Sequence, residues 1–123
     1  MTWSEIGKNN LQAAKLNLAG QPRSAASRAY YAAHVVLAEK LVANGCPLSP
    51  GRQTPAHAAQ ASLIGRHLAH EGTKVVRELR AVIRRLYARR IDADYKRNVT
   101  MDRLLAMESI RDASTLFQLL KVS

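Results

Sequence analysis

The chain of 123 residues is long enough to bury a real core, and we expect one domain over residues 1–123. Scarce glycine (6) and proline (4) indicate an ordered, mostly helical chain, and the 5% of aromatic residues requires a largely aliphatic core. The single cysteine excludes an internal disulfide and a four-cysteine zinc site, and the formal net charge of +10 favours a polyanionic partner such as RNA or DNA.

Two helices are predicted in the first third of the chain. A T-x-x-E capping box at residues 2–5 predicts a helix that begins at Trp3, and Gly20 ends it. A second helix is expected from Pro22 to about Asn44, because proline suits the first turn and a glycine follows the last residue.

A loop rich in proline and glycine follows at residues 46–54. Thr54 and Pro55 predict the N-cap and first turn of a third helix that ends near His70 or Gly72. The lone cysteine, Cys46, lies in this loop. Because the sequence holds no partner thiol, a reactive role is not expected.

Two more helices complete the pattern. Thr73 is expected to cap a fourth helix that lasts until about Arg90, residues 91–99 form a turn or a short irregular connection, and Thr100 caps a fifth helix. The apolar side of the fourth helix is Val75, Leu79, Val82 and Leu86; that of the fifth is Leu104, Leu105, Met107, Ile110, Leu116, Leu119 and Leu120. No segment alternates with period two, so an all-α, four- to five-helix up-and-down bundle is predicted.

The stretch S-R-A-Y-Y-A-A-H lies on the second predicted helix. At 100° per residue, Tyr30 and His34 share one sector with two leucines, whereas Arg28 lies on the far side. His34 is either a packed histidine with a satisfied nitrogen or an acid–base group.

This stretch, combined with L-Y-A-R-R-I-D-A-D-Y at residues 86–95, resembles the HEPN family. The family motif residues in this chain are Tyr30, Tyr31, Arg90, Asp94 and Tyr95. The resemblance implies a helical bundle that commonly dimerises and, in catalytic members, a metal-independent ribonuclease with an R-x(4–6)-H motif. No cofactor or metal is expected.

Arg28 and His34 fit that motif as R-x5-H and are the candidate catalytic residues. His34 would move a proton as the ribose 2′-hydroxyl attacks the phosphate, and Arg28 would hold the phosphoryl group. Six residues apart on one helix, they lie about 120° and about 9 Å from each other. We therefore expect a bend in the helix, or a second chain in a homodimer, to bring them together.

The resemblance implies two alternative functions. The first is a toxin-like endoribonuclease of a toxin–antitoxin or defence module, held in check by a nucleotidyltransferase-type antitoxin. The second is a non-catalytic HEPN protein that binds nucleotide or RNA, or docks a nucleotidyltransferase partner.

The positive charge concentrates in residues 74–97, which hold nine basic and three acidic side chains. Arg77, Arg80 and Arg84 line up opposite the apolar stripe over about 10 Å and are candidates for RNA binding or a merely solvated face. Tyr87 is expected to flank the apolar stripe rather than this row, so a sequence-reading surface is not predicted.

Three further positions have weaker expectations. Arg52 and His57 also match R-x4-H, but His57 is predicted to lie on the surface of a first turn. Asp94 is expected to pair with Arg28 or Arg90, and Tyr95 to close the bundle. Without an apolar run of ~20 residues or a signal-like N-terminus, the chain is expected to be cytoplasmic, with no membrane contact.

Overall fold

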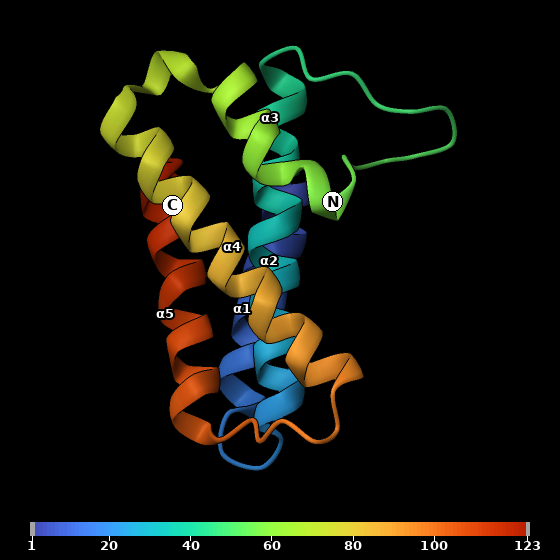
Figure 1. Ribbon diagram of the computed structural model, residues 1–123, viewed down its shortest axis with the longest axis vertical. Coiled ribbons are helices and arrows are strands. Elements are labelled where there is room, and N and C mark those ends of the chain that lie inside the picture. The colour runs from blue at the N-terminus through green and yellow to red at the C-terminus, as the bar shows by residue number, and fades with distance from the viewer. Residues whose placement is uncertain (1, 123) are drawn as a thin grey trace.

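A computed structural model describes residues 2–122, and within that range the chain is all-helical, as predicted. The α-helices are α1 (Trp3–Asn17), α2 (Pro22–Ala43), α3 (Gln60–His67), α4 (Thr73–Tyr95) and α5 (Arg103–Leu119). Short 3₁₀ turns, η1 (His57–Ala59) and η2 (Ala69–Glu71), flank α3. Helices α1, α2 and α5 run up and down along one axis, α4 crosses them obliquely, and α3 lies in front of the upper part of α2 (Figure 1).

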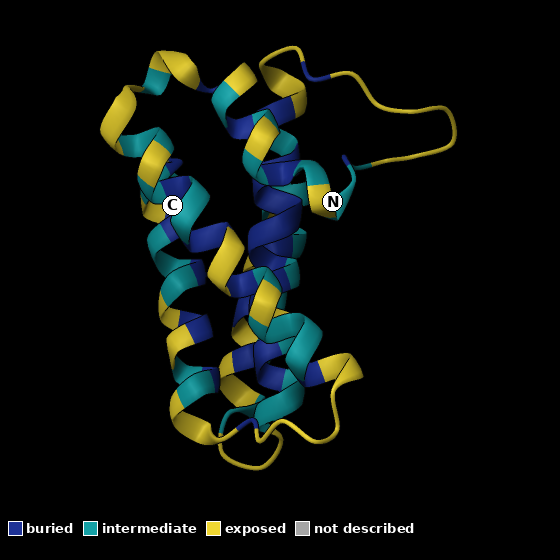
Figure 2. Cartoon of the chain, in the orientation of Figure 1, coloured by how far each residue is buried: buried dark blue, intermediate teal, exposed yellow. Residues whose placement is uncertain are grey.

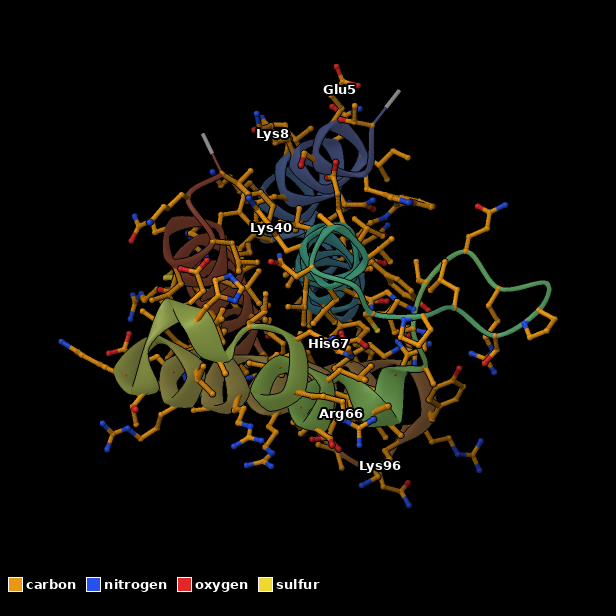
Figure 3. All side chains as sticks on the ribbon, turned by 90° about the horizontal axis from the view of Figure 1, so that it is seen from above. Glu5, Lys8, Lys40, Arg66, His67 and Lys96 are labelled. Atoms are coloured by element: carbon orange, nitrogen blue, oxygen red, sulfur yellow. The ribbon has the colours of Figure 1, made fainter. Side chains whose placement is uncertain are left out.

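Helix α2 is the centre of the bundle, with α1, α4 and α5 packed around it. Seen from above, α1 covers one side of α2, and α3 and α4 cover the other (Figure 3). The buried residues of the chain concentrate on α2 (Figure 2). Small side chains let the helices approach closely: a Cβ at Gly7 of α1 would lie 2.5 Å from Val36 Cγ2 and 3.0 Å from the Ala32 carbonyl oxygen of α2.

The first two helices agree with the prediction. The Thr2–Glu5 capping box is present, with the Glu5 amide donating to Thr2 Oγ1 at 3.1 Å and the Thr2 amide donating to the Glu5 carboxylate at 2.7 Å. Helix α2 begins at Pro22 and ends one residue before Asn44, and Gly45 follows with φ 91°.

The third helix begins later than predicted. Thr54 does not cap it, because the Thr54 hydroxyl is engaged with His34, and α3 proper starts at Gln60 after the turn η1. The predicted N-caps of the last two helices are also wrong. Thr73 is the first residue of α4, after Gly72 with φ 99°, and Asp102 rather than Thr100 caps α5 by accepting from the Leu105 amide at 2.9 Å.

Helix α4 extends to Tyr95, five residues beyond the predicted end. The guanidinium of Arg23 donates to the carbonyl oxygens of Asp92 and Ala93, each at 3.0 Å, and to those of Lys96 and Val99. These carbonyl groups belong to the last turn of α4 and the connection after it. A residue about 70 positions earlier therefore supports the end of this helix.

Helices α4 and α5 are joined by ion pairs. Arg85 and Arg89 of α4 lie 3.0 Å and 2.9 Å from the carboxylate of Asp112 on α5. Burial opposes ionisation of Asp112, but the hydrogen bonds from the two arginines outweigh it and lower the pKa of the carboxyl group. Leu104 was expected on the apolar side of α5 but is 69% exposed.

Candidate functional site

A hydrogen-bonded aromatic cluster lies where α2, η1 and α3 meet. Gln60 is its centre: the side-chain amide nitrogen donates to Tyr30 Oη at 2.7 Å and to the His57 carbonyl oxygen at 3.0 Å. Its amide oxygen lies 2.8 Å from His34 Nδ1, and Tyr30 Oη lies 2.5 Å from His57 Nδ1. The imidazole rings of His34 and His57 are stacked with centroids 4.1 Å apart.

The network fixes which ring nitrogen of each histidine carries hydrogen. A carbonyl oxygen only accepts, so the nitrogen of the Gln60 amide must face the His57 carbonyl, and the oxygen must face His34 Nδ1. His34 Nδ1 therefore donates, and its Nε2 accepts from the Thr54 hydroxyl at 3.3 Å. Tyr30 is fully buried and its hydroxyl already accepts from Gln60, so its own hydrogen needs an acceptor, and His57 Nδ1 is the one within reach. With Tyr30 donating, the hydrogen of a neutral His57 lies on Nε2.

Both histidines are held in the neutral form. Burial, followed by the positive charge of His34, Arg90 and Arg52, lowers the pKa of His57 to about 4. Burial also lowers the pKa of His34, which is 3% exposed. The same desolvation raises the pKa of the Tyr30 hydroxyl, so Tyr30 stays protonated as the donor that the network requires.

The family motif residues of α4 surround this cluster. The Arg90 guanidinium donates to Tyr31 Oη at 2.7 Å, lies 3.0 Å from the Asp94 carboxylate, and stacks near the Tyr31 ring at 5.3 Å. Asp94 pairs with Arg90, one of its two predicted partners, and also accepts from the Ser27 hydroxyl at 3.1 Å. Tyr95 does not close the bundle: it is 68% exposed, and its hydroxyl accepts from Arg90 at 3.4 Å.

Arg28 and His34 do not meet within one chain. Arg28 is exposed, and its guanidinium is 3.4 Å from Asn10 Oδ1 on α1. His34 is buried on the opposite side of α2, with both ring nitrogens engaged by Gln60 and Thr54. The side chains lie on different faces of the helix, as the six-residue spacing predicts.

A groove between α3 and α4 gathers arginine side chains. We call this hollow of about 640 Å³ the arginine groove; it is lined by Arg66, Arg77, Arg80 and Arg84, together with Ser62 and Thr73. Figure 3 shows Arg66 on the outer side of α3 and His67 on the side that faces the bundle. No aspartate or glutamate lines the groove.

The three predicted arginines do not form a uniform solvated row. Arg77 and Arg84 are exposed, and neither forms an ion pair with a carboxylate within residues 2–122. Arg80 is partly buried, donates from Nε to the Ala61 carbonyl oxygen at 2.8 Å, and packs against Gly65. Arg80 therefore joins α4 to α3, and its charge lies at the floor of the groove.

A smaller hollow of about 330 Å³, which we call the His57 hollow, adjoins one end of the arginine groove. It is lined by His57, Gln60, Ile83 and Tyr87, and it shares Ser62 and Arg84 with the groove. Tyr87 packs against the core, as expected for a residue that flanks the apolar stripe, and it also lines a hollow with Arg84, one arginine of the predicted row. Among residues 2–122, no group of three or more His, Cys, Asp or Glu side chains is suited to hold a metal ion.

Sequence reasoning missed His57, Gln60 and Tyr87 as residues of the site. The R-x4-H match of Arg52 and His57 was the available signal, but the predicted surface position of His57 was wrong, because its ring stacks on His34 and bonds Tyr30. No local pattern marks Gln60, whose partners come from α2 and η1.

The all-helical bundle, with its aromatic cluster and basic groove, defines a small helical protein with a polar site between its second, third and fourth helices. The family model described as HEPN domain matches residues 1–123, so the chain belongs to the HEPN family, as the two sequence motifs indicated. Comparisons with curated proteins and with solved structures gave no match. None of the helices described between residues 2 and 122 has both the length and the apolar character needed to cross a membrane.

Proposed function

We propose that this HEPN protein binds RNA along the arginine groove. The observation that carries the proposal is the lining of the groove, which holds four arginines and no carboxylate. Such a surface attracts the phosphate backbone of a nucleic acid. The net charge of +10 adds a long-range attraction of the same sign.

Three other arginines of α4 already form ion pairs within the protein. Arg85 and Arg89 hold Asp112, and Arg90 holds Asp94. Arg77 and Arg84 are exposed and without such partners, so their charge is available to a ligand. They are two turns apart on one helix face, a span of about 10 Å that matches a few phosphates.

Fluorescence anisotropy with a labelled single-stranded 20-nucleotide RNA tests this proposal. The double variant Arg77→Ala/Arg84→Ala should weaken binding at least tenfold at 0.1 M salt, and it should lower the salt-dependence slope by about 1.4. The matched control Arg103→Ala/Arg111→Ala removes the same charge from exposed positions on α5. An equal loss of RNA affinity in both double variants would show that only net charge matters, and it would contradict the proposal that RNA binds along the arginine groove.

A second candidate is a metal-independent endoribonuclease of a toxin–antitoxin or defence module, active as a homodimer with Arg28 and His34 as catalytic residues. The stacking of His34 on His57 favours it, because His57 lines the His57 hollow and connects the buried histidine to the groove. Arg28 is exposed and open to a partner chain, which would have to supply the convergence that one chain lacks.

Inducible expression in a bacterial host, with RNA integrity followed directly, tests the nuclease. The decisive variant is Arg28→Ala, because an exposed residue can be removed without disturbing the core. Growth arrest and RNA cleavage by wild type, lost in Arg28→Ala and suppressed by a co-expressed nucleotidyltransferase, would support this candidate. Intact RNA in cells that contain folded wild-type protein would contradict it and leave binding as the function.

A further inference from the structure

We propose that the groove selects single-stranded RNA by accepting one unpaired base in the His57 hollow, next to the phosphates held by the arginines. This inference rests on the proposed function and deepens it, since it names the class of RNA and the residues that distinguish it. Three features of the hollow carry it: its lining, its position and its hydrogen-bonding pattern.

The lining suits a flat heteroaromatic ring. The aromatic side chains of Tyr87 and His57 have nearly parallel rings, with an interplanar angle of 19°, and Ile83 adds an aliphatic surface. The hollow of about 330 Å³ is at the small end of the range for ligand pockets. Nucleobases bind proteins largely by contact with aromatic and aliphatic side chains of this kind.

The position suits a base that is attached to a bound backbone. Ser62 and Arg84 line both the His57 hollow and the arginine groove, so the two spaces meet at these side chains. A nucleotide whose phosphate lies at Arg84 therefore has the hollow within reach of its base. The next phosphates along the strand can then follow the groove toward Arg77.

The hydrogen bonds of the cluster prepare the hollow for a base edge. Because Tyr30 donates its hydroxyl hydrogen to His57 Nδ1, the neutral imidazole carries its own hydrogen on Nε2, which is therefore a donor. Among residues 2–122, no side chain is hydrogen-bonded to that Nε2, and the Ser62 hydroxyl lies in the same lining. Carbonyl oxygens and ring nitrogens of bases are acceptors that match such donors.

A duplex cannot use this hollow in the same way. Its bases are stacked and paired, and the deep major groove of A-form RNA hides their edges from side chains. Double-stranded RNA would contact only the arginines. The arrangement therefore predicts a preference for single strands that depends on Tyr87 and not on charge.

The test compares three RNAs: a single-stranded 20-nucleotide uridine RNA, the same strand made abasic, and a 20-base-pair duplex. Fluorescence anisotropy measures the affinity of each RNA for the wild type and for the variants Tyr87→Leu and Tyr87→Phe. Wild type should bind the single strand at least tenfold more tightly than the duplex or the abasic strand. Tyr87→Leu should weaken single-strand binding about 5- to 100-fold and leave duplex binding unchanged, whereas Tyr87→Phe keeps an aromatic face and should restore most of the affinity.

The wild-type comparison does not depend on how well a variant folds. Equal affinity for the natural and abasic single strands would overturn the base-binding inference and leave the arginine groove as a phosphate site. Loss of affinity in Arg77→Ala/Arg84→Ala but not in Tyr87→Leu would have the same meaning. Absence of binding to all three RNAs would overturn the proposed function itself, and the inference with it.

Discussion

At the scale of single residues, the stacked pair of His34 and His57 is built to stay uncharged. Two imidazolium rings 4.1 Å apart would repel each other, and Arg90 adds a third positive charge close by. The titratable and charged groups that face His57 are Tyr30, Tyr31 and His34 from α2, Tyr87 and Arg90 from α4, and Arg52 from the loop. None of these side chains is a carboxylate that would favour the protonated imidazole.

This setting predicts that the protein loses stability as pH falls below neutrality. An imidazole in the unfolded chain binds a proton near pH 6.5, whereas folded His57 does so only near pH 4. Between those values the unfolded state binds more protons, so the free energy of unfolding decreases as pH is lowered. The contribution is complete above about pH 6.5 and is lost as the pH approaches 4.

Thermal unfolding between pH 7.5 and 5.5 measures this effect. The midpoint of wild type should fall across the window, and His57→Gln should show a flatter dependence. The control His70→Gln changes an exposed histidine and should keep the wild-type slope. A wild-type midpoint that is constant across the window would refute the account of the histidine pair.

Residue patterns predicted part of the site. The 100° rotation per residue placed Tyr30 and His34 on the buried side of α2 and Arg28 on the other, and the structure agrees. The pattern did not reveal Gln60, because a central residue of a polar network is defined by partners from other segments. His57 was assigned to the surface for the same reason.

At the scale of helices, the end of α4 depends on a side chain from the start of α2. Four carbonyl oxygens accept hydrogen bonds from the one guanidinium of Arg23. The sequence of residues 91–99 contains turn-forming residues, so a local interpretation ended the helix at Arg90. Long-range capping explains the five extra residues, and no local signal could have indicated it.

Arg23→Ala should destabilise the protein by about 2 kcal/mol, because the carbonyl groups lose a charged donor. The matched variant Arg28→Ala removes an exposed arginine from the same helix and should change stability by less than about 0.5 kcal/mol. Urea unfolding monitored by circular dichroism gives both values. Equal stability of the two variants would contradict the capping role of Arg23.

The contact between α1 and α2 gives a second prediction at this scale. Gly7→Ala would place a methyl group 2.5 Å from Val36 Cγ2, so α1 must shift, and we expect a net loss of about 1–2 kcal/mol. Gly20→Ala is the control, since a methyl group there meets nothing within 4 Å. Urea unfolding of both variants measures the difference; a Gly7→Ala protein as stable as wild type would refute close packing at this position.

At the scale of the whole molecule, composition and periodicity were sufficient to predict the helical bundle, and the two sequence motifs indicated its family. They were not sufficient to predict the groove, which depends on how α3 lies against α4. Arg80 joins the two helices through the Ala61 carbonyl oxygen, and the absence of a side chain at Gly65 lets its guanidinium approach. The sequence could therefore name Arg77, Arg80 and Arg84, but neither the groove that they line nor the adjoining His57 hollow, where Arg84 meets Tyr87.

The charge of the molecule and its shape then act together. The net charge of +10 attracts any polyanion from a distance, and the α3–α4 side combines exposed arginines with an adjoining aromatic hollow. The hollow beside Arg28 is lined by Arg23 and Arg28, but also by Asp94, whose carboxylate makes it less suited to an anion. The arrangement of charged groups, and not the net charge of the molecule, distinguishes the two.

The central claim, that single-stranded RNA lies in the arginine groove and the His57 hollow, is tested most directly by amide NMR spectra during an RNA titration. The account predicts shifts in residues 57–66 and in residues 73–87, with little change in residues 103–119. Shifts confined to residues 23–28 and 93–95 would place the ligand beside Arg28 and contradict the account.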